Sequence, residues 1–324
     1  MKQIKIYLFA LLAALTVAAC SNSDDNGGSG TSNSRNDNKN IVTIGVPAEV
    51  TRMEFPKIKG GTSQIIVHKT DQYGVNFCTE YDLKLKSQRW SCYAVYKTNN
   101  VTGWNRDYWK YGINGQPFQW DGKTWGHKVE PFQLDPAISA DSQAGIHEYN
   151  NNKPFYARGH IVASQDRINC MDANGQTFYM TNMQPMQHEG FNDGAWSKME
   201  VKIRNFASIY IKTTSDTMWV CKGGTIDKGD QILGYTTNHF IIPKFFFAAV
   251  LVKNTQGLRA IGFWFEHKAY ASSEKLSAHV VNIARLQELT GIDFFCNLPD
   301  SDENKVENDN LTAERIKSLW NITN

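Results

Sequence analysis

One run of residues limits the fold of this chain more than any other, HFIIPKFFFAAVLVKN at residues 239–254. It is rich in β-branched and aromatic residues, a composition typical of a β-strand. Seven more runs of this kind are separated by turn-forming residues, at 63–70, 74–82, 90–97, 155–163, 177–182, 217–223 and 258–267. Strands therefore form most of the framework.

Three segments carry helical periodicity instead, at residues 192–210, 277–290 and 312–320. Gly291 follows the second of them directly, as expected for a helix end. Many strands with few helices between them predict an α+β layered fold with an antiparallel-rich sheet, and fit a doubly wound parallel sheet less well. Because no internal linker interrupts the chain, we expect one folded domain at residues 41–324.

The amino-terminal end predicts export. Residues 1–19 read as a signal peptide, because Lys2 and Lys5 precede an apolar run, residues 6–19, that is shorter than the ~20 residues of a membrane span. The sequence VAAC resembles a bacterial lipobox and implies a lipid anchor on Cys20; the alternative is an ordinary cleaved signal with Cys20 free. Residues 20–40 are almost devoid of apolar residues and predict a disordered tether. The expected location is the bacterial cell envelope, on the outer membrane or cell surface.

Charge and cysteine content narrow the possibilities. The chain has 34 Lys and Arg against 32 Asp and Glu, so an enzyme acting on nucleic acid must concentrate its positive charge locally. The six cysteines include no C-x-x-C pair, which argues against a zinc–thiolate site. In an exported protein Cys78 and Cys92 could form a disulfide across a hairpin, and Cys221 with Cys296 is a second possible pair.

Three motifs lie within fifty residues: RGH at 158–160, TNMQP at 181–185 and FNDGAWSKMEVKIR at 191–204. In identity and spacing they resemble the signature of the sugar-non-specific DNA/RNA endonucleases, ββα-metal nucleases that include secreted bacterial nucleases and mitochondrial endonuclease G. The chain departs from that signature twice. Ala157 stands where the family has an aspartate, and Glu130 aligns with an upstream arginine whose charge Arg106 could supply.

The resemblance implies a role for each motif residue. His160 suits a general base, because imidazole titrates near neutrality, and Arg158 can hold phosphate oxygens. Asn192 would be the metal ligand, leaving most of the ion's coordination shell to water and phosphate, as Mg²⁺ prefers. The alternative is that Asn192 only caps a helix.

The remaining motif residues have supporting roles. Glu200 lies eight residues after Asn192, ~12 Å along a helix, so it would hold a metal-bound water rather than share the inner shell. Arg204 could pair with Glu200 or reach a phosphate. Asn182 is assigned a positioning role, with a turn residue as the alternative. Asp166 and Arg167 are interpreted as structural support.

The sequence thus predicts an Mg²⁺-dependent endonuclease, with Mn²⁺ as another usable ion, that cuts DNA and RNA without marked sequence specificity. The alternative is a non-catalytic surface lipoprotein that binds glycan or nucleic acid. Its stacking platforms would be tryptophans of the long segment between residues 96 and 156: Trp104, Trp109, Trp120 and Trp125. A serine hydrolase is not indicated, because no G-x-S-x-G occurs.

Overall fold

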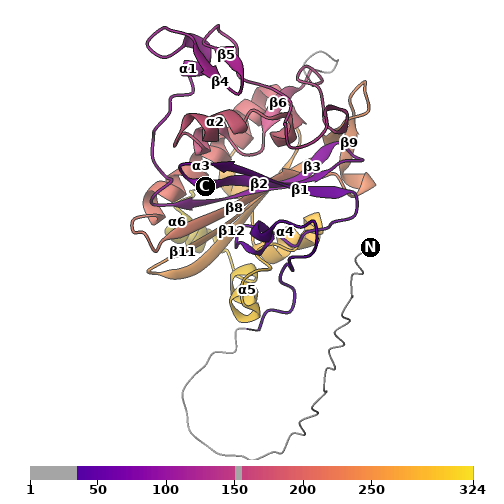
Figure 1. Cartoon of the computed structure of the whole chain (residues 1–324). Coiled ribbons are helices and arrows are strands. Elements are labelled where there is room, and N and C mark those ends of the chain that lie inside the picture. Colours follow the sequence, from indigo (N-terminus) through magenta and orange to yellow (C-terminus); the bar gives the residue numbers. More distant parts are fainter. Residues whose placement is uncertain (1–34, 150–154, 324) are drawn as a thin grey trace, which may run out of the picture. The chain divides into compact units, whose positions relative to one another are not determined.

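The computed structural model describes residues 35–149 and 155–323. Its centre is a seven-stranded sheet with the order β1-β2-β3-β8-β11-β12-β13, and every neighbouring pair is antiparallel (Figure 1). The strands are β1 (Ser63–Thr70), β2 (Gly74–Asp82), β3 (Ser87–Tyr96), β8 (Thr217–Gly224), β11 (Phe245–Asn254), β12 (Gly257–Glu266) and β13 (Val280–Val281). The predicted α+β architecture is confirmed.

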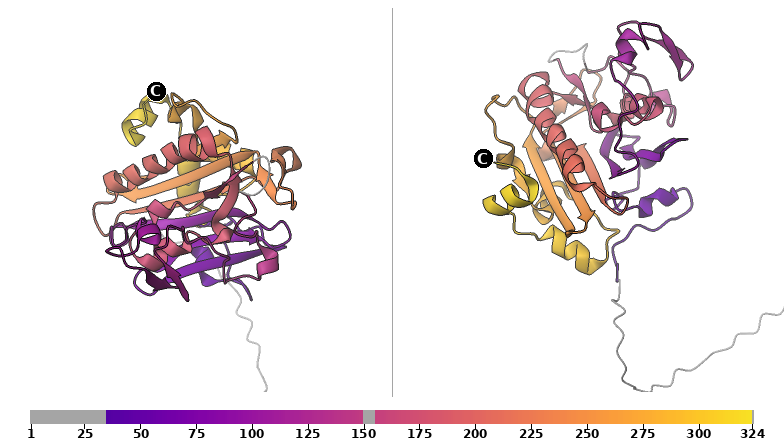
Figure 2. Two further views of the ribbon diagram at one scale, coloured as in Figure 1. Left: turned by 90° about the horizontal axis from the view of Figure 1, so that it is seen from above. Right: turned by 90° about the vertical axis from the view of Figure 1, so that its left-hand side faces the viewer.

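Both faces of this sheet are covered, which explains the apolar run that forms β11. Phe246, Ala248, Val250 and Val252 belong to one core cluster, and Phe247, Ala249 and Leu251 belong to another. Since successive side chains of a strand point to opposite faces, a strand between two layers has no polar face. Helices α3 (Ser197–Tyr210) and α6 (Ala313–Trp320) pack in the first cluster, and α4 (Ile283–Thr290) and α5 (Asp300–Glu307) in the second (Figure 2).

The three motifs form a compact unit on the α3 face of the sheet. Strands β6 (Ala157–His160) and β7 (Met183–Met186) pair antiparallel, and a π-helical segment (His188–Trp196) leads from β7 into α3. This is the predicted ββα element. The smaller elements are α1 (Tyr108–Tyr111), β4 (Phe118–Trp120), β5 (Lys123–Trp125), α2 (Met171–Gln176), β9 (Ile232–Tyr235) and β10 (Ile241–Pro243).

Several element boundaries differ from the prediction: the run 239–254 divides into β10 and β11, and two other differences have a clear physical reason. The helix expected at 277–290 begins only at Ile283, because Val280–Val281 pair with β12 and the Asn282 side chain caps the helix at the Arg285 amide. It does end at Gly291, whose φ is 76°. The strand expected at 177–182 is instead β7, because residues 180–182 form a 3₁₀ turn.

The folded region begins before residue 41. Asn38 donates hydrogen bonds to Asp293 and Glu303, and Asn40 donates to the carbonyls of Val50 and Pro56. The end of the predicted tether is therefore part of the domain, since asparagine side chains can replace apolar contacts by bonding to backbone and carboxylates. The predicted signal peptide, Cys20 and the tether up to residue 34 lie outside the described residues. Within the described ranges, no helix has the length and apolarity needed to cross a membrane.

The cysteines at described positions are free thiols. Cys78 and Cys92 face each other in the β2–β3 register, and Cys221 faces Cys92 from β8, but none of the described cysteines is paired. The predicted Cys78–Cys92 disulfide and the second pair with Cys296 are thus absent from this structure. All four sulfurs are buried, three of them in one apolar cluster, where a thiol packs as a small hydrophobic group.

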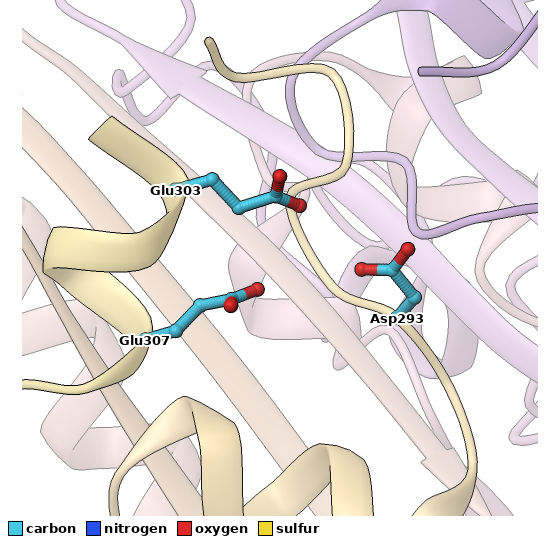
Figure 3. Close-up of side chains that lie close together, drawn as sticks. All are labelled: Asp293, Glu303 and Glu307. Atoms are coloured by element: carbon cyan, nitrogen blue, oxygen red, sulfur yellow. The ribbon is translucent and has the colours of Figure 1, made fainter. Parts of the chain in front are cut away.

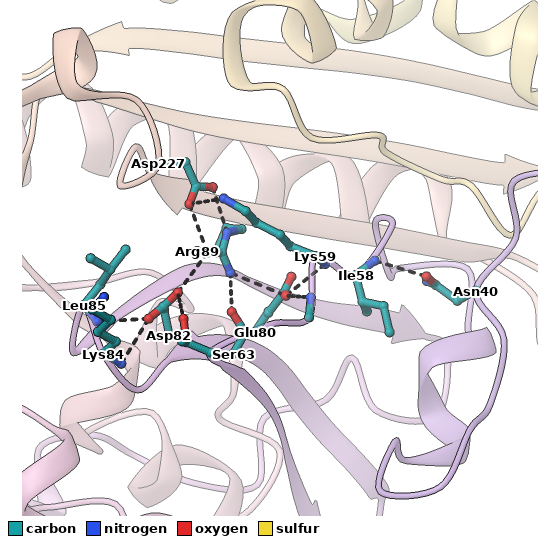
Figure 4. A network of polar contacts seen from close by, with 12 residues as sticks. Asn40, Ile58, Lys59, Ser63, Glu80, Asp82, Lys84, Leu85, Arg89 and Asp227 are labelled. Atoms are coloured by element: carbon teal, nitrogen blue, oxygen red, sulfur yellow. Dashed lines mark hydrogen bonds and ion pairs between the residues drawn. The ribbon is translucent and has the colours of Figure 1, made fainter.

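A buried arginine joins the first strands of the sheet to the loop after β8. Arg89 on β3 donates hydrogen bonds to Asp227, Asp82 and Ser63, and its Nη1 lies 3.4 Å from Glu80 (Figure 4). Three carboxylates offset one buried guanidinium, so its burial is compensated by charge-assisted bonds.

The four tryptophans of the long segment between β3 and β6 have their own small core. Trp104, Trp109, Trp120 and Trp125 are each at most 8% exposed and pack with Phe178 and Tyr179. They are not available as stacking platforms, which removes the main support for the binding-only interpretation.

Candidate active site

A cleft of about 510 Å³ opens between β6, α3 and the long segment that precedes β6. Five of the six residues predicted to act at the site line it: Arg158, His160, Asn192, Glu200 and Arg204. They come from a strand, a π-helical segment and a helix, so the fold rather than the sequence order brings them together.

His160, the last residue of β6, is held by two aromatic side chains, Phe178 and Trp196. Its imidazole packs edge-on against Phe178 at a centroid distance of 4.9 Å, and the Trp196 indole donates to its backbone carbonyl at 3.2 Å. The Arg158 backbone interacts favourably with the imidazole, and Nε2 is buried with no hydrogen-bond partner among the described residues. The backbone thus provides the orienting contact that Ala157 cannot.

Burial holds the pKa of His160 well below its usual range, and the positive charges of Arg106, Lys222 and Arg158 add to this effect. A neutral imidazole is the form that can accept a proton. His160 is therefore in the protonation state that a general base requires at neutral pH.

Asn192 lies in the first helical turn after a kink at Glu189 and Gly190, and this turn continues into α3. No side-chain cap bond is formed at either helix start, so the structure gives no support to the predicted alternative role of Asn192 as a cap. Its backbone amide donates to the Gln187 carbonyl at 3.0 Å, while its side chain lines the cleft. π-helical turns are rare and occur often at functional sites.

The approach to this segment is fixed by a glycine and a histidine that the motif reading did not include. Gly190 has a φ of 72°, and a Cβ there would lie 2.7 Å from the Tyr270 carbonyl oxygen. His267 accepts the Gln187 amide at Nε2, 2.7 Å away, and its Nδ1 lies 2.7 Å from the Pro243 carbonyl. Burial lowers the pKa of His267 to about 4, so it stays neutral and can make both bonds.

A buried lysine lies beneath Glu200. Lys222 on β8 is fully buried, and its Nζ lies 3.6 Å from Glu200 Oε1 and 3.5 Å from Asp166 Oδ2. Burial raises the pKa of Glu200 to about 7, and Lys222 opposes that rise. Although burial alone would raise it, the charges of Lys222 and Arg204 hold the pKa of Asp166 below its usual range.

Arg204 and Asn182 differ from the simplest prediction. Arg204 pairs with Asp166 at 2.9 Å and not with Glu200, although it does line the cleft. Asn182 is fully buried and does not line the cleft. Its side chain bonds both backbone groups of Val162 and the Thr177 carbonyl, so it fixes the chain just after His160. Its role is positional, because no polar atom of it is left for substrate.

Two further arginines contribute positive charge to the cleft. Arg158 lies over the Phe132 ring at 3.6 Å and donates to the Ile146 carbonyl. Arg106 comes from the long segment, lines the cleft and pairs with Glu130 at 2.6 Å. Arg106 therefore brings a positive charge to the cleft, whereas Glu130, which aligns with the family's upstream arginine, is acidic.

The donor set of the cleft fits a hard divalent cation. Asn192 offers an amide oxygen that makes no hydrogen bond to another described residue, and the buried Glu200 Oε1 has the ion pair with Lys222 but no hydrogen bond within the described residues. Oxygen donors with room for water are what Mg²⁺ prefers.

A second group of acidic side chains lies elsewhere. Asp293, Glu303 and Glu307 have carboxylate oxygens within 4.8 Å of one another, but none of them lines the cleft (Figure 3). We refer to these three residues as the carboxylate cluster.

The sequence motifs did not indicate Lys222 or His267 as parts of the site. Lys222 reads as an ordinary residue of a strand, and nothing in the run that ends at His267 indicates a contact with residue 187. Arg106, which the sequence suggested as a source of the upstream positive charge, lines the cleft.

Comparison with known proteins agrees with the geometry. The family model described as DNA/RNA non-specific endonuclease matches residues 61–301. A nuclease of Syncephalastrum racemosum is 28% identical over 180 residues, covering 52% of this chain and 56% of that protein. The mitochondrial nuclease EXOG of Homo sapiens is 23% identical over 179 residues, covering 52% and 46%. The chain thus matches roughly half the length of these relatives.

A solved structure shares the fold. It is the EndoG chain in a crystal structure of the EndoG/EndoGI complex, described as showing the mechanism of EndoG inhibition. The TM-score is 0.57 at 16% sequence identity, and the match covers 78% of this chain and 93% of the other. At this identity the similarity concerns the fold.

Proposed function

The chain belongs to the family of DNA/RNA non-specific endonucleases, and on that premise we propose that its cleft hydrolyses phosphodiester bonds of DNA and RNA without marked sequence specificity. The observation that carries the proposal is one cleft lined by His160, whose buried Nε2 has no hydrogen-bond partner among the described residues, by the Asn192 amide, and by Glu200, whose Oε1 has only the ion pair with Lys222 at 3.6 Å. Buried polar atoms are normally hydrogen-bonded, so these groups are suited to contact substrate, water or metal.

The chemistry follows from the positions of the side chains. His160 Nε2 accepts a proton from water as the water oxygen bonds to phosphorus and the bond from phosphorus to the 3′ oxygen breaks, leaving a 5′-phosphate end. Arg158, Arg204 and Arg106 offset the charge of the phosphate oxygens. The family is metal-dependent; Asn192 would hold an Mg²⁺ that supplies positive charge at the scissile phosphate, with Glu200 holding a metal-bound water, and Mn²⁺ could replace the Mg²⁺.

Sequence-blind cutting fits the groups that line the cleft. Arginine side chains recognise phosphate, and contacts to phosphate and sugar carry no direct base information. The almost balanced net charge of the chain makes this local concentration of arginines necessary, because no global positive field attracts a polynucleotide.

The test uses purified protein with supercoiled plasmid and with a structured RNA, in Mg²⁺ and in EDTA. Wild type should degrade both substrates only with metal. His160→Ala should reduce the rate by about 10²- to 10⁴-fold, the usual contribution of a positioned base, while the exposed control His239→Ala should not change it. Metal-dependent degradation that persists in His160→Ala at the wild-type rate would contradict the proposal.

We also propose that the protein is lipid-anchored through Cys20 at the surface of a bacterial envelope. The support is the VAAC sequence at residues 17–20 and the polar segment after it. Membrane fractionation of cells that express wild type or Cys20→Ser, together with labelling by a fatty-acid analogue, tests this. A label of equal intensity in both proteins would exclude Cys20 as the attachment site.

A further inference from the structure

A second, smaller cavity adjoins the cleft along α3. It measures about 150 Å³ and shares two lining residues with the cleft, Gln165 and Arg204. We call it the side pocket and define it by Val95, Val101, Arg167, Ile203, Ser208 and Met218 together with those two shared residues. Its volume is well below the ~300–1,000 Å³ of pockets for drug-sized ligands, so it suits a single ring system.

The side pocket follows the catalytic residues along one face of α3. Glu200, Arg204 and Ser208 are four residues apart on α3 and therefore follow one another along one helix face, ~6 Å per step. Glu200 lines the cleft, Arg204 lines both cavities and Ser208 lines the side pocket. Because Asp166 holds Arg204 at 2.9 Å, the boundary between the two cavities is fixed.

The walls of the side pocket combine polar residues, among them Asn99, Thr102 and the carboxylate of Asp166, with apolar ones, which suits a flat, partly polar ring. Val95, Ile203 and Met218 are buried apolar residues that form one side. Arg167 is 1% exposed, and its Nε has no hydrogen-bond partner among the described residues, although its Nη2 bonds the Ala94 carbonyl. An apolar wall with one unused donor matches a ring that stacks and offers an acceptor.

We propose that the side pocket is a subsite for the base of a nucleotide next to the scissile phosphate. The inference rests on the proposed nuclease function and adds where the substrate strand lies: from the cleft past Arg204 toward the carboxyl-terminal part of α3. Every nucleobase has a π-face and an acceptor atom, so one apolar wall and one N–H donor accept all of them. Such a subsite gives binding energy without sequence preference.

The test uses short single-stranded oligonucleotides in which one phosphodiester linkage is cleavable and all others are phosphorothioates. Two further substrates lack the base on one or the other side of that linkage. Wild type should lose roughly 5- to 100-fold in kcat/KM on one of the two abasic substrates, the range expected for one stacked base. Equal rates on all three substrates would overturn the proposal.

Variants that fill the pocket locate the effect. Ser208→Trp, at the rim on α3, should lower kcat/KM on the intact substrate by a similar factor and leave it unchanged on the sensitive abasic one. Val101→Trp, on the opposite wall, should do the same. The matched control is Ile209→Trp, since Ile209 is 43% exposed, adjacent to Ser208, and lines neither cavity.

A base-free substrate separates the two proposals. Hydrolysis of a phosphodiester strand that lacks all of its bases, and so carries no stacking ring, should be equal in wild type, Ser208→Trp and Ile209→Trp, which also shows that the variants are folded. If wild type hydrolyses neither this base-free strand nor any oligonucleotide with Mg²⁺, the nuclease function fails. If the base-free strand is hydrolysed but Ser208→Trp loses equally on intact and abasic strands, only the base subsite fails.

Discussion

The cleft and the carboxylate cluster are two places where this fold gathers acidic or metal-binding side chains, and they are built in opposite ways. The carboxylate cluster has three carboxylates, but amide groups occupy them: Asn38 donates to Asp293 and Glu303, and Gln287 donates to Glu307. The cleft has fewer acidic groups, and two of its buried atoms, His160 Nε2 and Glu200 Oε1, have no hydrogen-bond partner among the described residues, although Glu200 forms an ion pair with Lys222. The number of carboxylates is therefore a poorer guide to the functional metal site than the presence of unpaired donors around a cavity.

The largest expected difference between the two regions is in metal-dependent activity. Asn192→Ala removes the amide oxygen that faces the cleft and should lower the cleavage rate at a fixed Mg²⁺ concentration by about 10²- to 10³-fold, since the metal contributes several kcal/mol of charge stabilisation. Asp293→Asn in the carboxylate cluster should leave the rate and the Mg²⁺ half-saturation unchanged. Titration of activity with Mg²⁺ checks both variants. An equal shift of the Mg²⁺ half-saturation in both variants would contradict this difference between the cleft and the carboxylate cluster.

The next largest effect concerns Lys222, the buried lysine beneath Glu200. Lys222→Met should reduce activity at pH 7 by about 10- to 100-fold, because the carboxylate of Glu200 then loses the charge that opposes its protonation. As the pKa of Glu200 rises above about 7, the acid limb of the pH–rate profile should move to higher pH.

Activity of Lys222→Met should therefore recover in part at alkaline pH, whereas a purely structural defect would lower the rate at every pH. Lys222→Arg should retain more activity than Lys222→Met, and the exposed Lys253→Met is the control. Infrared spectra of metal-free protein, compared with Glu200→Gln, report the protonated carboxyl directly. An unshifted pH profile in Lys222→Met would show that Lys222 does not act through Glu200.

The contacts of His267 that support the cleft should weaken at acidic pH. The pKa of His267 is about 4 in the folded protein and near 6.5 when unfolded, so the unfolded state binds the proton more readily between these values. Stability is fully present above pH 6.5 and is lost as pH falls toward 4, by about 2–3 kcal/mol. Urea unfolding at pH 4.5 and 7.5 should show this loss in wild type and a smaller loss in His267→Gln. Equal losses in both proteins would contradict the assignment.

The carboxylate cluster should have the opposite and smaller dependence. Burial raises the pKa of Glu307 to about 7, so the folded state holds a proton that the unfolded state has released, and stability is lost as pH rises from 4.5 through 7. Glu307→Gln keeps an acceptor for Gln287 and should stabilise the protein at pH 8 by about 1 kcal/mol, after allowance for screening. Thermal unfolding at pH 5 and 8 measures this, with the exposed Glu288→Gln as control. A stabilisation of equal size at pH 5 would rule out titration as its cause.

Much of the fold was predictable because strands carry a strong local signal. β1 and β2 have the predicted bounds, and β11 lies within the predicted run. The sequence predicts the correct end of the helix before Gly291 but places its start too early. Val280–Val281 pair with β12, and helical periodicity carries no information on such a tertiary contact. The strand expected at 177–182 failed for a similar reason, since the Asn182 side chain stabilises a turn by bonding to Val162.

The site was predictable where one motif holds several of its residues. His160, Asn192, Glu200 and Arg204 line one cleft, as their shared motif spacing indicates. Lys222 could not be found, because its importance comes from burial beside two carboxylates and not from its sequence neighbours. The disulfide between Cys78 and Cys92 was expected from strand pairing, which is correct, but the pairing alone does not oxidise two thiols packed in an apolar layer.

The asparagines at residues 38 and 40 attach the first described residues to the α4–α5 side of the sheet, and the cleft lies on the α3 side. Anything that holds the protein by its amino-terminal part therefore pulls on the layer remote from catalysis. If Cys20 carries a lipid, the membrane attachment acts through the α4–α5 layer, and the cleft on the α3 layer stays open to a long polymer that enters from either direction without a free end. A force on the attachment would act first on the asparagine contacts and the carboxylate cluster, and not on the catalytic layer.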